Sequence, residues 1–174
     1  NEEIAKKVNK AVFPGVQGGP LMHVIAGKAV CFKEALEPSF KTYVSQYIKN
    51  AKAMADEFRD LGYRVISGGT DNHIVLIDVK QKTGLTGLRA QEILESGKIT
   101  VNKNSIPFDT EPPKYTSGIR LGSAALTTRG FKEEDFKEIV RLIDLILTNS
   151  ENQKTINEVR TKVSELCQKY PLKY

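Results

Sequence analysis

The stretch Tyr63–Val79 reads YRVISGGTDNHIVLIDV, and it decides the fold. Its two ends, Tyr63–Ser67 and Ile74–Val79, have the β-branched and aromatic composition of strands. The intervening Gly68–Asn72 is rich in turn residues. Two strand-like runs joined by a short turn predict neighbouring strands of one sheet.

A long helical region precedes this pair of strands. Leu21–Ala35 is alanine-rich and helical in composition, and Pro38 predicts a kink or break after it. Beyond the break, apolar residues recur at helical spacing as far as Leu61 and Gly62, which form a good C-terminal stop. These apolar residues are Phe40, Tyr43, Val44, Tyr47, Ala51, Met54, Ala55 and Phe58.

The chain after Val79 mixes short helices and strands. Gly87–Ser96 predicts a helix, Ile99–Val101 a strand that runs into the polar loop Asn102–Ser105, and Gly118–Gly122 a further strand. Two helices close the chain, each with one apolar face. The faces consist of Phe136, Ile139, Val140, Ile143, Ile146 and Leu147, and of Ile156, Val159, Val163, Leu166 and Tyr170. This order predicts an α/β fold of the α+β kind, with a small, mainly antiparallel sheet covered by helices on one side.

The composition is that of an ordinary globular domain. Of the 174 residues, 40% are hydrophobic and 27% are charged, so disorder is not expected. No apolar stretch approaches the roughly 20 residues of a membrane-spanning helix. Cys31 and Cys167 are far apart and form no CxxC pair. We therefore expect reduced cysteines on helices, one of them buried, and a cytoplasmic protein.

The net charge of +5 raises the question of nucleic-acid binding. Lysine and arginine are spread along amphipathic segments and mixed with acidic residues, without forming blocks. The pattern favours a solvated basic surface, which could also serve anionic ligands, over a nucleic-acid interface.

Arg120 is the first candidate binding residue. It lies in TSGIRLGS, where strand alternation sends Ile119 and Leu121 to one face and Arg120 to the other. The flanking glycines predict open space around the guanidinium group. Its planar fork suits a ligand carboxylate through two parallel hydrogen bonds. A structural ion pair at a sheet edge is the alternative.

A loop of glycines and prolines supplies the second candidate. Phe13–Pro20 (FPGVQGGP) must be irregular, because three glycines and two prolines in eight positions break both helix and strand. Gly18 and Gly19 precede Pro20, which we place at the first position of the next helix. Bare backbone amides at this point suit a phosphate or a carboxylate, although the segment could also be a turn that simply needs glycine.

The sequence indicates the roles of other polar residues less specifically. Asn102, Lys103 and Asn104 (VNKNS) could bind a polar heterocycle or cap a turn. His23 and His73 have no partner at triad spacing and are interpreted as structural. The sequence contains no nucleotide-binding or zinc-protease motif, and we expect no metal site.

Taken together, several motifs resemble the serine hydroxymethyltransferase family. They are FPGVQGGPLMHVIAGKAV, SGGTDNHIVLIDV, VNKNSIPFD and TSGIRLGSAALTTRGF, in this order, with a closing YP. The resemblance implies the C-terminal portion of the aspartate-aminotransferase-like fold. Residues 1–35 would form the tail of the large cofactor domain and the start of a long linking helix, and residues 36–174 the C-terminal small domain. It also implies a homodimer or a dimer of dimers with a shared active site. Such an enzyme interconverts serine and glycine, with pyridoxal 5'-phosphate as cofactor and tetrahydrofolate as one-carbon acceptor.

The resemblance gives roles to particular residues. Arg120 matches the arginine that binds the amino-acid carboxylate, and Gly18 and Gly19 match the loop that reaches the cofactor phosphate of the neighbouring subunit. Asn104 matches an asparagine beside the folate pteridine. The other folate positions are Phe13 and Pro14 at the entrance and the loop residues Pro112, Pro113, Lys114 and Tyr115, which read PPKY where the family often has serine, proline and phenylalanine.

One family residue has no counterpart. The family places its Schiff-base lysine directly after a histidine, whereas His23 precedes Val24 and His73 precedes Ile74. The cofactor-stacking histidine and the aspartate at the pyridine nitrogen are also missing. We therefore expect a chain that begins after the lysine-bearing segment and is inactive alone. The alternative is a stand-alone dimerisation module that binds an anionic metabolite or RNA.

Overall fold

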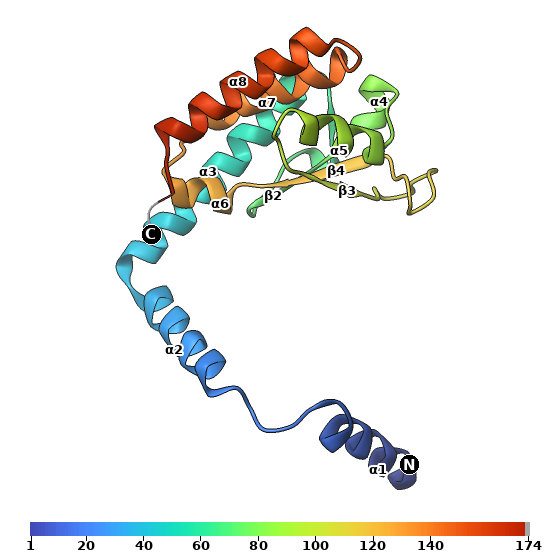
Figure 1. Ribbon diagram of the computed structural model, residues 1–174, viewed down its shortest axis with the longest axis vertical. Helices are drawn as coiled ribbons and strands as arrows, with labels where there is room; N and C mark the ends of the chain where they lie inside the picture. Colours follow the sequence, from blue (N-terminus) through green and yellow to red (C-terminus); the bar gives the residue numbers. More distant parts are fainter. Residues whose placement is uncertain (173–174) are drawn as a thin grey trace. The chain divides into compact units, whose positions relative to one another are not determined.

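The computed structural model describes residues 1–172, which divide into two compact units, Asn1–Lys41 and a larger one that begins at Thr42 (Figure 1). The first unit contains α1 (Glu2–Lys10), the π-type turn η1 (Ala11–Val16) and α2 (Met22–Leu36). Every residue of this unit is exposed within the single chain.

The glycine and proline loop is irregular, as predicted. Phe13 and Pro14 interrupt η1 with non-helical backbone angles, and residues 17–21 belong to no helix. The predicted position of Pro20 is wrong, however. Leu21 is the extended residue that precedes α2, with φ −77° and ψ 102°, so Pro20 stands two residues before the helix.

The helix after Pro38 has the predicted boundaries. α3 (Pro38–Asp60) begins at Pro38, since Glu37 is extended and ends α2. It stops just before Gly62, whose φ of +86° lies in the left-handed region that glycine adopts without strain.

The second unit contains one antiparallel sheet of four strands. The strands β1 (Arg64–Val65), β2 (Ile74–Asp78), β3 (Asn102–Asn104) and β4 (Gly118–Gly122) lie in the order β1-β2-β4-β3. The predicted pairing of the first two strands is confirmed. The first is shorter than expected, because Ile66–Gly68 forms the 3₁₀ turn η2.

The predicted strand Ile99–Val101 is wrong, because its backbone completes the preceding helix. α5 (Gly87–Ser96) ends as predicted, and the amide of Ile99 donates to the carbonyl of Leu94 at 2.9 Å. Lys98 has a φ of +65°, which turns the chain there. Pairing with β4 starts only at Asn102.

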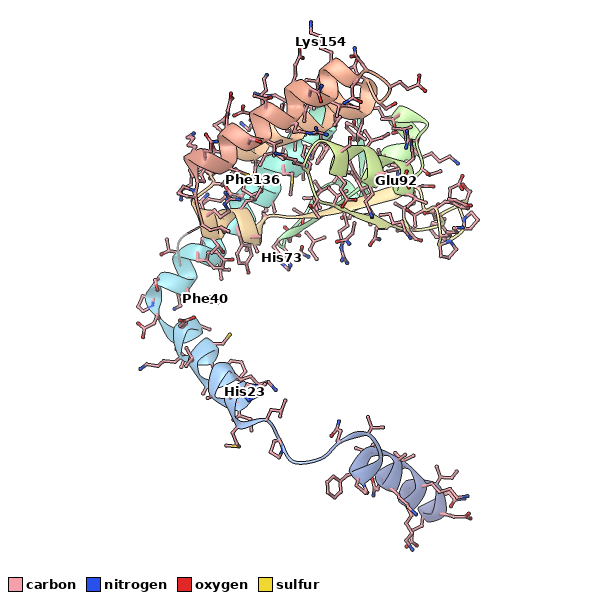
Figure 2. The ribbon with its side chains drawn as sticks, viewed as in Figure 1. His23, Phe40, His73, Glu92, Phe136 and Lys154 are labelled. Atoms are coloured by element: carbon pink, nitrogen blue, oxygen red, sulfur yellow. The ribbon has the colours of Figure 1, made fainter. Side chains whose placement is uncertain are left out.

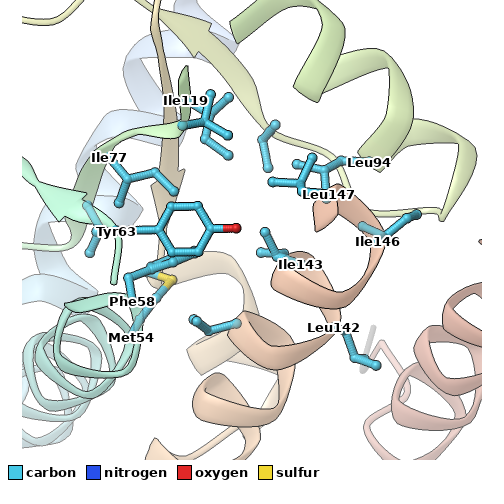
Figure 3. Close-up of a cluster of buried hydrophobic side chains, with 14 of the residues drawn as sticks. Met54, Phe58, Tyr63, Ile77, Leu94, Ile119, Leu142, Ile143, Ile146 and Leu147 are labelled. Carbon is cyan, nitrogen blue, oxygen red and sulfur yellow. The ribbon is translucent and has the colours of Figure 1, made fainter. Parts of the chain in front are cut away.

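Helices cover one face of the sheet, as Figure 1 shows, so the predicted fold class is confirmed. The remaining helices of this unit are α4 (Val79–Thr83), α6 (Ala124–Arg129), α7 (Glu133–Thr148) and α8 (Gln153–Lys169). Val75, Ile77 and Ile119 of the sheet are buried beneath them. Figure 3 shows how these strands meet α3 and α7 in the core, where the labelled side chains are Met54, Phe58, Tyr63, Ile77, Leu94, Ile119, Leu142, Ile143, Ile146 and Leu147.

Buried polar groups in this core have partners. Asn50 of α3 is fully buried, and its amide group donates to Thr127 Oγ1 at 2.8 Å and to the carbonyl of Phe131 at 3.0 Å. Its amide oxygen accepts a hydrogen bond from Gln46 at 3.0 Å. This network ties α3 to α6 and to the start of α7, which stabilises the frame that holds β4.

Candidate active site

Arg120 lies on the face of the sheet that the helices leave open. The register pairs it with Leu76 of β2 and Asn102 of β3. Directly opposed residues of antiparallel strands share a face. Its neighbour Ile119 is buried and Leu121 packs against the core, whereas Arg120 is exposed, as the alternation predicted. The guanidinium group can therefore meet a ligand without disturbing the core.

Asn104 lies on the same face, two positions along from Asn102 and opposite Gly118. Its side-chain Nδ2 donates to the carbonyl of Ser105 at 2.7 Å, which is the turn-capping contact that the sequence allowed as an alternative. The structure thus brings Arg120 and Asn104 together on one surface, while the folate role of Asn104 stays a prediction.

The sequence predicted open space at both glycines that flank Arg120, but only one of them has it. Gly122 is open, since an added Cβ atom would meet only the carbonyl oxygen of His73, at 3.7 Å. At Gly118 the same atom would lie 2.7 Å from Ile106 Cγ2, 2.8 Å from the Ile77 carbonyl oxygen and 2.9 Å from that of Asn104. The expectation is therefore wrong at Gly118, where close packing of three segments demands glycine.

This contrast gives a matched pair of substitutions. Gly118→Ala should destabilise the domain by about 1–3 kcal/mol, because overpacking forces two strands and Ile106 apart. Gly122→Ala, in the same strand, should change the free energy of unfolding by less than about 1 kcal/mol, the usual scale of a glycine-to-alanine change without a clash. Urea unfolding followed by circular dichroism measures both, and equal effects would contradict the packing argument.

Asp109 organises the loop that carries the predicted folate residues. Its carboxylate accepts hydrogen bonds from the amides of Ile106, Glu111 and Ser117 at 2.9–3.1 Å and from Ser117 Oγ at 2.6 Å. Although desolvation acts in the opposite direction, these hydrogen bonds lower the pKa of Asp109 to about 2. Asp109 is not among the site residues predicted from the sequence. An aspartate followed by turn residues, which bonds to the backbone two positions on, was the available signal.

The loop should loosen in acid. The lowered pKa means that ionised Asp109 contributes its full stabilisation above pH about 3.8, the ordinary value, and that this is lost as the pH falls towards about 2. Asp109→Ala should cost about 1–3 kcal/mol at neutral pH, because it leaves several donors without an acceptor. Hydrogen exchange of the Ser117 amide reports the loss. The control is Asp71→Ala, since the side chain of Asp71 is fully exposed and should be silent.

Pro112–Tyr115 form an exposed turn of this loop. The amides of Tyr115 and Thr116 both donate to the carbonyl of Pro112, at 2.9 and 3.0 Å. The ammonium group of Lys114 lies 5.5 Å from the centre of the Tyr115 ring. The predicted folate positions Pro112, Pro113, Lys114 and Tyr115 are thus accessible to a ligand.

The remaining predicted positions belong to the first unit. Gly18 and Gly19 are exposed, and an added Cβ atom would meet nothing within 4 Å at either one. A phosphate could therefore approach this backbone closely, and no side chain caps the N-terminus of α2 beside it. Phe13 and Pro14 lie in η1, where the Phe13 side chain is 63% exposed.

The histidines and cysteines have no catalytic arrangement in residues 1–172. His73 precedes β2 (Figure 2), and its ring makes an edge-to-face contact with Tyr47 at 5.9 Å. Both Cys31 and Cys167 are exposed, so the prediction that one of them is buried is wrong. Cys167 follows the buried Leu166 on α8 and therefore points to a different side of that helix.

The fold and the open face together define a small α/β domain with an arginine and an asparagine on one face of its sheet. The family model for serine hydroxymethyltransferase matches residues 1–143 of this chain, and the chain belongs to that family. Membership supports a transferase function in one-carbon metabolism, in a family that uses pyridoxal phosphate and tetrahydrofolate. Within the described residues, no helix is both long and apolar enough to cross a membrane.

Proposed function

We propose that this chain is the C-terminal part of a serine hydroxymethyltransferase that interconverts serine and glycine, and that Arg120 binds the carboxylate of the amino acid. The observation that carries this proposal is the exposure of Arg120 on the open face of the sheet, opposite Asn102 and Leu76. An arginine held on a rigid strand keeps its planar fork in place for bidentate hydrogen bonds to a carboxylate.

Gly18 and Gly19 are the proposed phosphate contacts for pyridoxal phosphate. Their exposed backbone, which no side chain covers, suits an anion beside a helix N-terminus. The cofactor, when bound, supplies the electron sink for the α-carbanion of the substrate. Arg120 would then hold the substrate carboxylate, and Gly18 and Gly19 would contact the cofactor phosphate of the neighbouring subunit.

Tetrahydrofolate is the proposed one-carbon acceptor. Asn104 and Arg120 share a face, and Asp109 fixes the loop that follows Asn104. The pteridine would lie beside Asn104. The loop residues Pro112–Tyr115 would line the rest of its site, together with Phe13 and Pro14 of the partner subunit.

We propose that the protein works as a cytoplasmic homodimer whose first unit is covered by protein. The support is the exposure of apolar side chains along α1 and α2, because helices with unpartnered apolar residues are normally buried. The division at residues 35 and 36 into the tail of the cofactor domain and the small domain also stays a proposal. The exposed apolar residues of the helices are Ile4, Val8, Met22, Val24, Ile25, Val30, Phe32 and Leu36.

The 174 residues alone should be inactive, because no lysine follows a histidine anywhere in them. Incubation with pyridoxal phosphate and reduction with borohydride should label no specific lysine. The complete enzyme, treated in the same way, should incorporate one cofactor per chain. Stoichiometric labelling at one lysine of the 174-residue chain would contradict the proposal.

A further inference from the structure

A cavity of about 390 Å³ opens among α6, α7, α8 and the segment Lys98–Asn102. It is lined by residues of the second unit only. Most of the lining is apolar, and the side chains come from elements far apart in sequence. The main apolar contributors are Ile99, Val101, Leu126, Phe131, Ile139 and Val163.

The charged residues of the cavity all have one sign. Lys98, Arg120 and Arg129 line it, and no aspartate or glutamate does. The guanidinium group of Arg129 is fixed, because Nε donates to the carbonyl of Tyr170 at 2.7 Å and Nη2 to that of Cys167 at 2.9 Å. Among the described residues, Lys98 Nζ has a neutral hydrogen-bond partner, Ser164 Oγ, at 3.4 Å, and no acidic one. An apolar cavity with positive charge attracts a ligand of the complementary kind.

This cavity shares Arg120 with the proposed active site, but most of its lining comes from other elements. Leu121, which packs against the core, also contributes to its wall, so the cavity extends from β4 towards the helices. Val163, Leu166 and Cys167 of α8 also line it, and they lie beyond residues 1–143, the part that matches the family. A wall is therefore built from a segment that the family match does not include.

We propose that this cavity binds a small amphipathic anion, such as a medium-chain carboxylate. The apolar walls accept the hydrocarbon chain, for which burial away from water is favourable. The carboxylate lies at the mouth, towards Lys98, where the described lining residues carry positive charge and include no acidic side chain.

Decanoate is the probe, and isothermal titration of the 174-residue chain measures its affinity. Decyltrimethylammonium has the same hydrocarbon chain and a cationic head, so it should bind at least about tenfold more weakly. Methyl resonances of Ile99 and Val163 should shift on addition of decanoate. Equal affinity for the two probes, or shifts confined to the exposed apolar helices of the first unit, would overturn the proposal.

Two variants test the apolar cavity and its positive charge separately. Ala125 is exposed on α6 and lines the cavity, so Ala125→Trp should fill its mouth and abolish the shifts at Ile99 and Val163. Lys98→Asn removes the positive charge, and asparagine tolerates the positive φ of this position. This variant should weaken the affinity for decanoate by about two- to fivefold. Decanoate binding that survives in a folded Ala125→Trp protein would refute the assignment.

A matched control uses a lysine away from the cavity. Lys154 lies near the start of α8, far from the labelled Phe136 that lines the cavity (Figure 2). Lys154→Asn removes the same charge and should leave decanoate affinity unchanged. A loss equal to that of Lys98→Asn would show that net charge, and not the cavity, governs binding.

Discussion

Arg120→Ala in the complete enzyme should lower kcat/KM for serine by about 30- to several-thousandfold, which corresponds to about 2–5 kcal/mol. The reason is that the substrate carboxylate loses its bidentate partner in a site that shields it from water. Arg120 is exposed on the open face, so its removal should not change the free energy of unfolding by more than about 0.5 kcal/mol. Steady-state kinetics with serine and tetrahydrofolate, together with a denaturation curve, separate these effects.

Two further variants sharpen this test. Arg120→Lys keeps the charge but loses the planar fork, so it should recover only part of the lost activity. Arg89→Ala removes another exposed arginine, whose partner is Glu92 at 3.3 Å on the same helix, and should leave the kinetics unchanged. Unchanged serine kinetics in Arg120→Ala would remove Arg120 from the proposed site.

Local sequence patterns predicted the elements that carry the site, because alternation and helical spacing act over a few residues. The opposite orientations of Ile119 and Arg120 follow directly from the pleat of one strand. The start of β3 did not follow, because the amide of Ile99 caps α5 and leaves pairing to Asn102. Apolar composition alone cannot distinguish a helix cap from a strand.

Interactions between distant segments were beyond the reach of sequence reasoning. Gly118 was read as open space, yet Ile106 and the neighbouring strand fill the volume beside it. Asp109 binds Ser117 eight residues away, and nothing in the spacing specifies that the loop closes there. Such errors arise wherever tertiary packing decides the role of a small or polar residue.

The two units differ in how well each one buries its own apolar side chains. In the larger unit, strand and helix faces that the sequence marked as apolar are buried against each other. In Asn1–Lys41 the apolar residues of α1 and α2 remain exposed, so packing within that unit does not account for them. The sequence predicted α2, and the proposed assembly would cover these apolar residues.

Phe58→Ala should destabilise the larger unit by about 3–5 kcal/mol, the largest stability effect expected of a single substitution in this core. Phe58 is fully buried on α3, and its ring meets Tyr63 edge-to-face at 5.3 Å (Figure 3). Truncation leaves a cavity beneath β2, the strand that supports Arg120 through β4. Phe108→Ala is the matched control, because Phe108 is 100% exposed and should change stability by less than about 0.5 kcal/mol. The chain has no tryptophan, so urea unfolding is followed by circular dichroism, and similar midpoints for the two variants would contradict the assignment of Phe58 to the core.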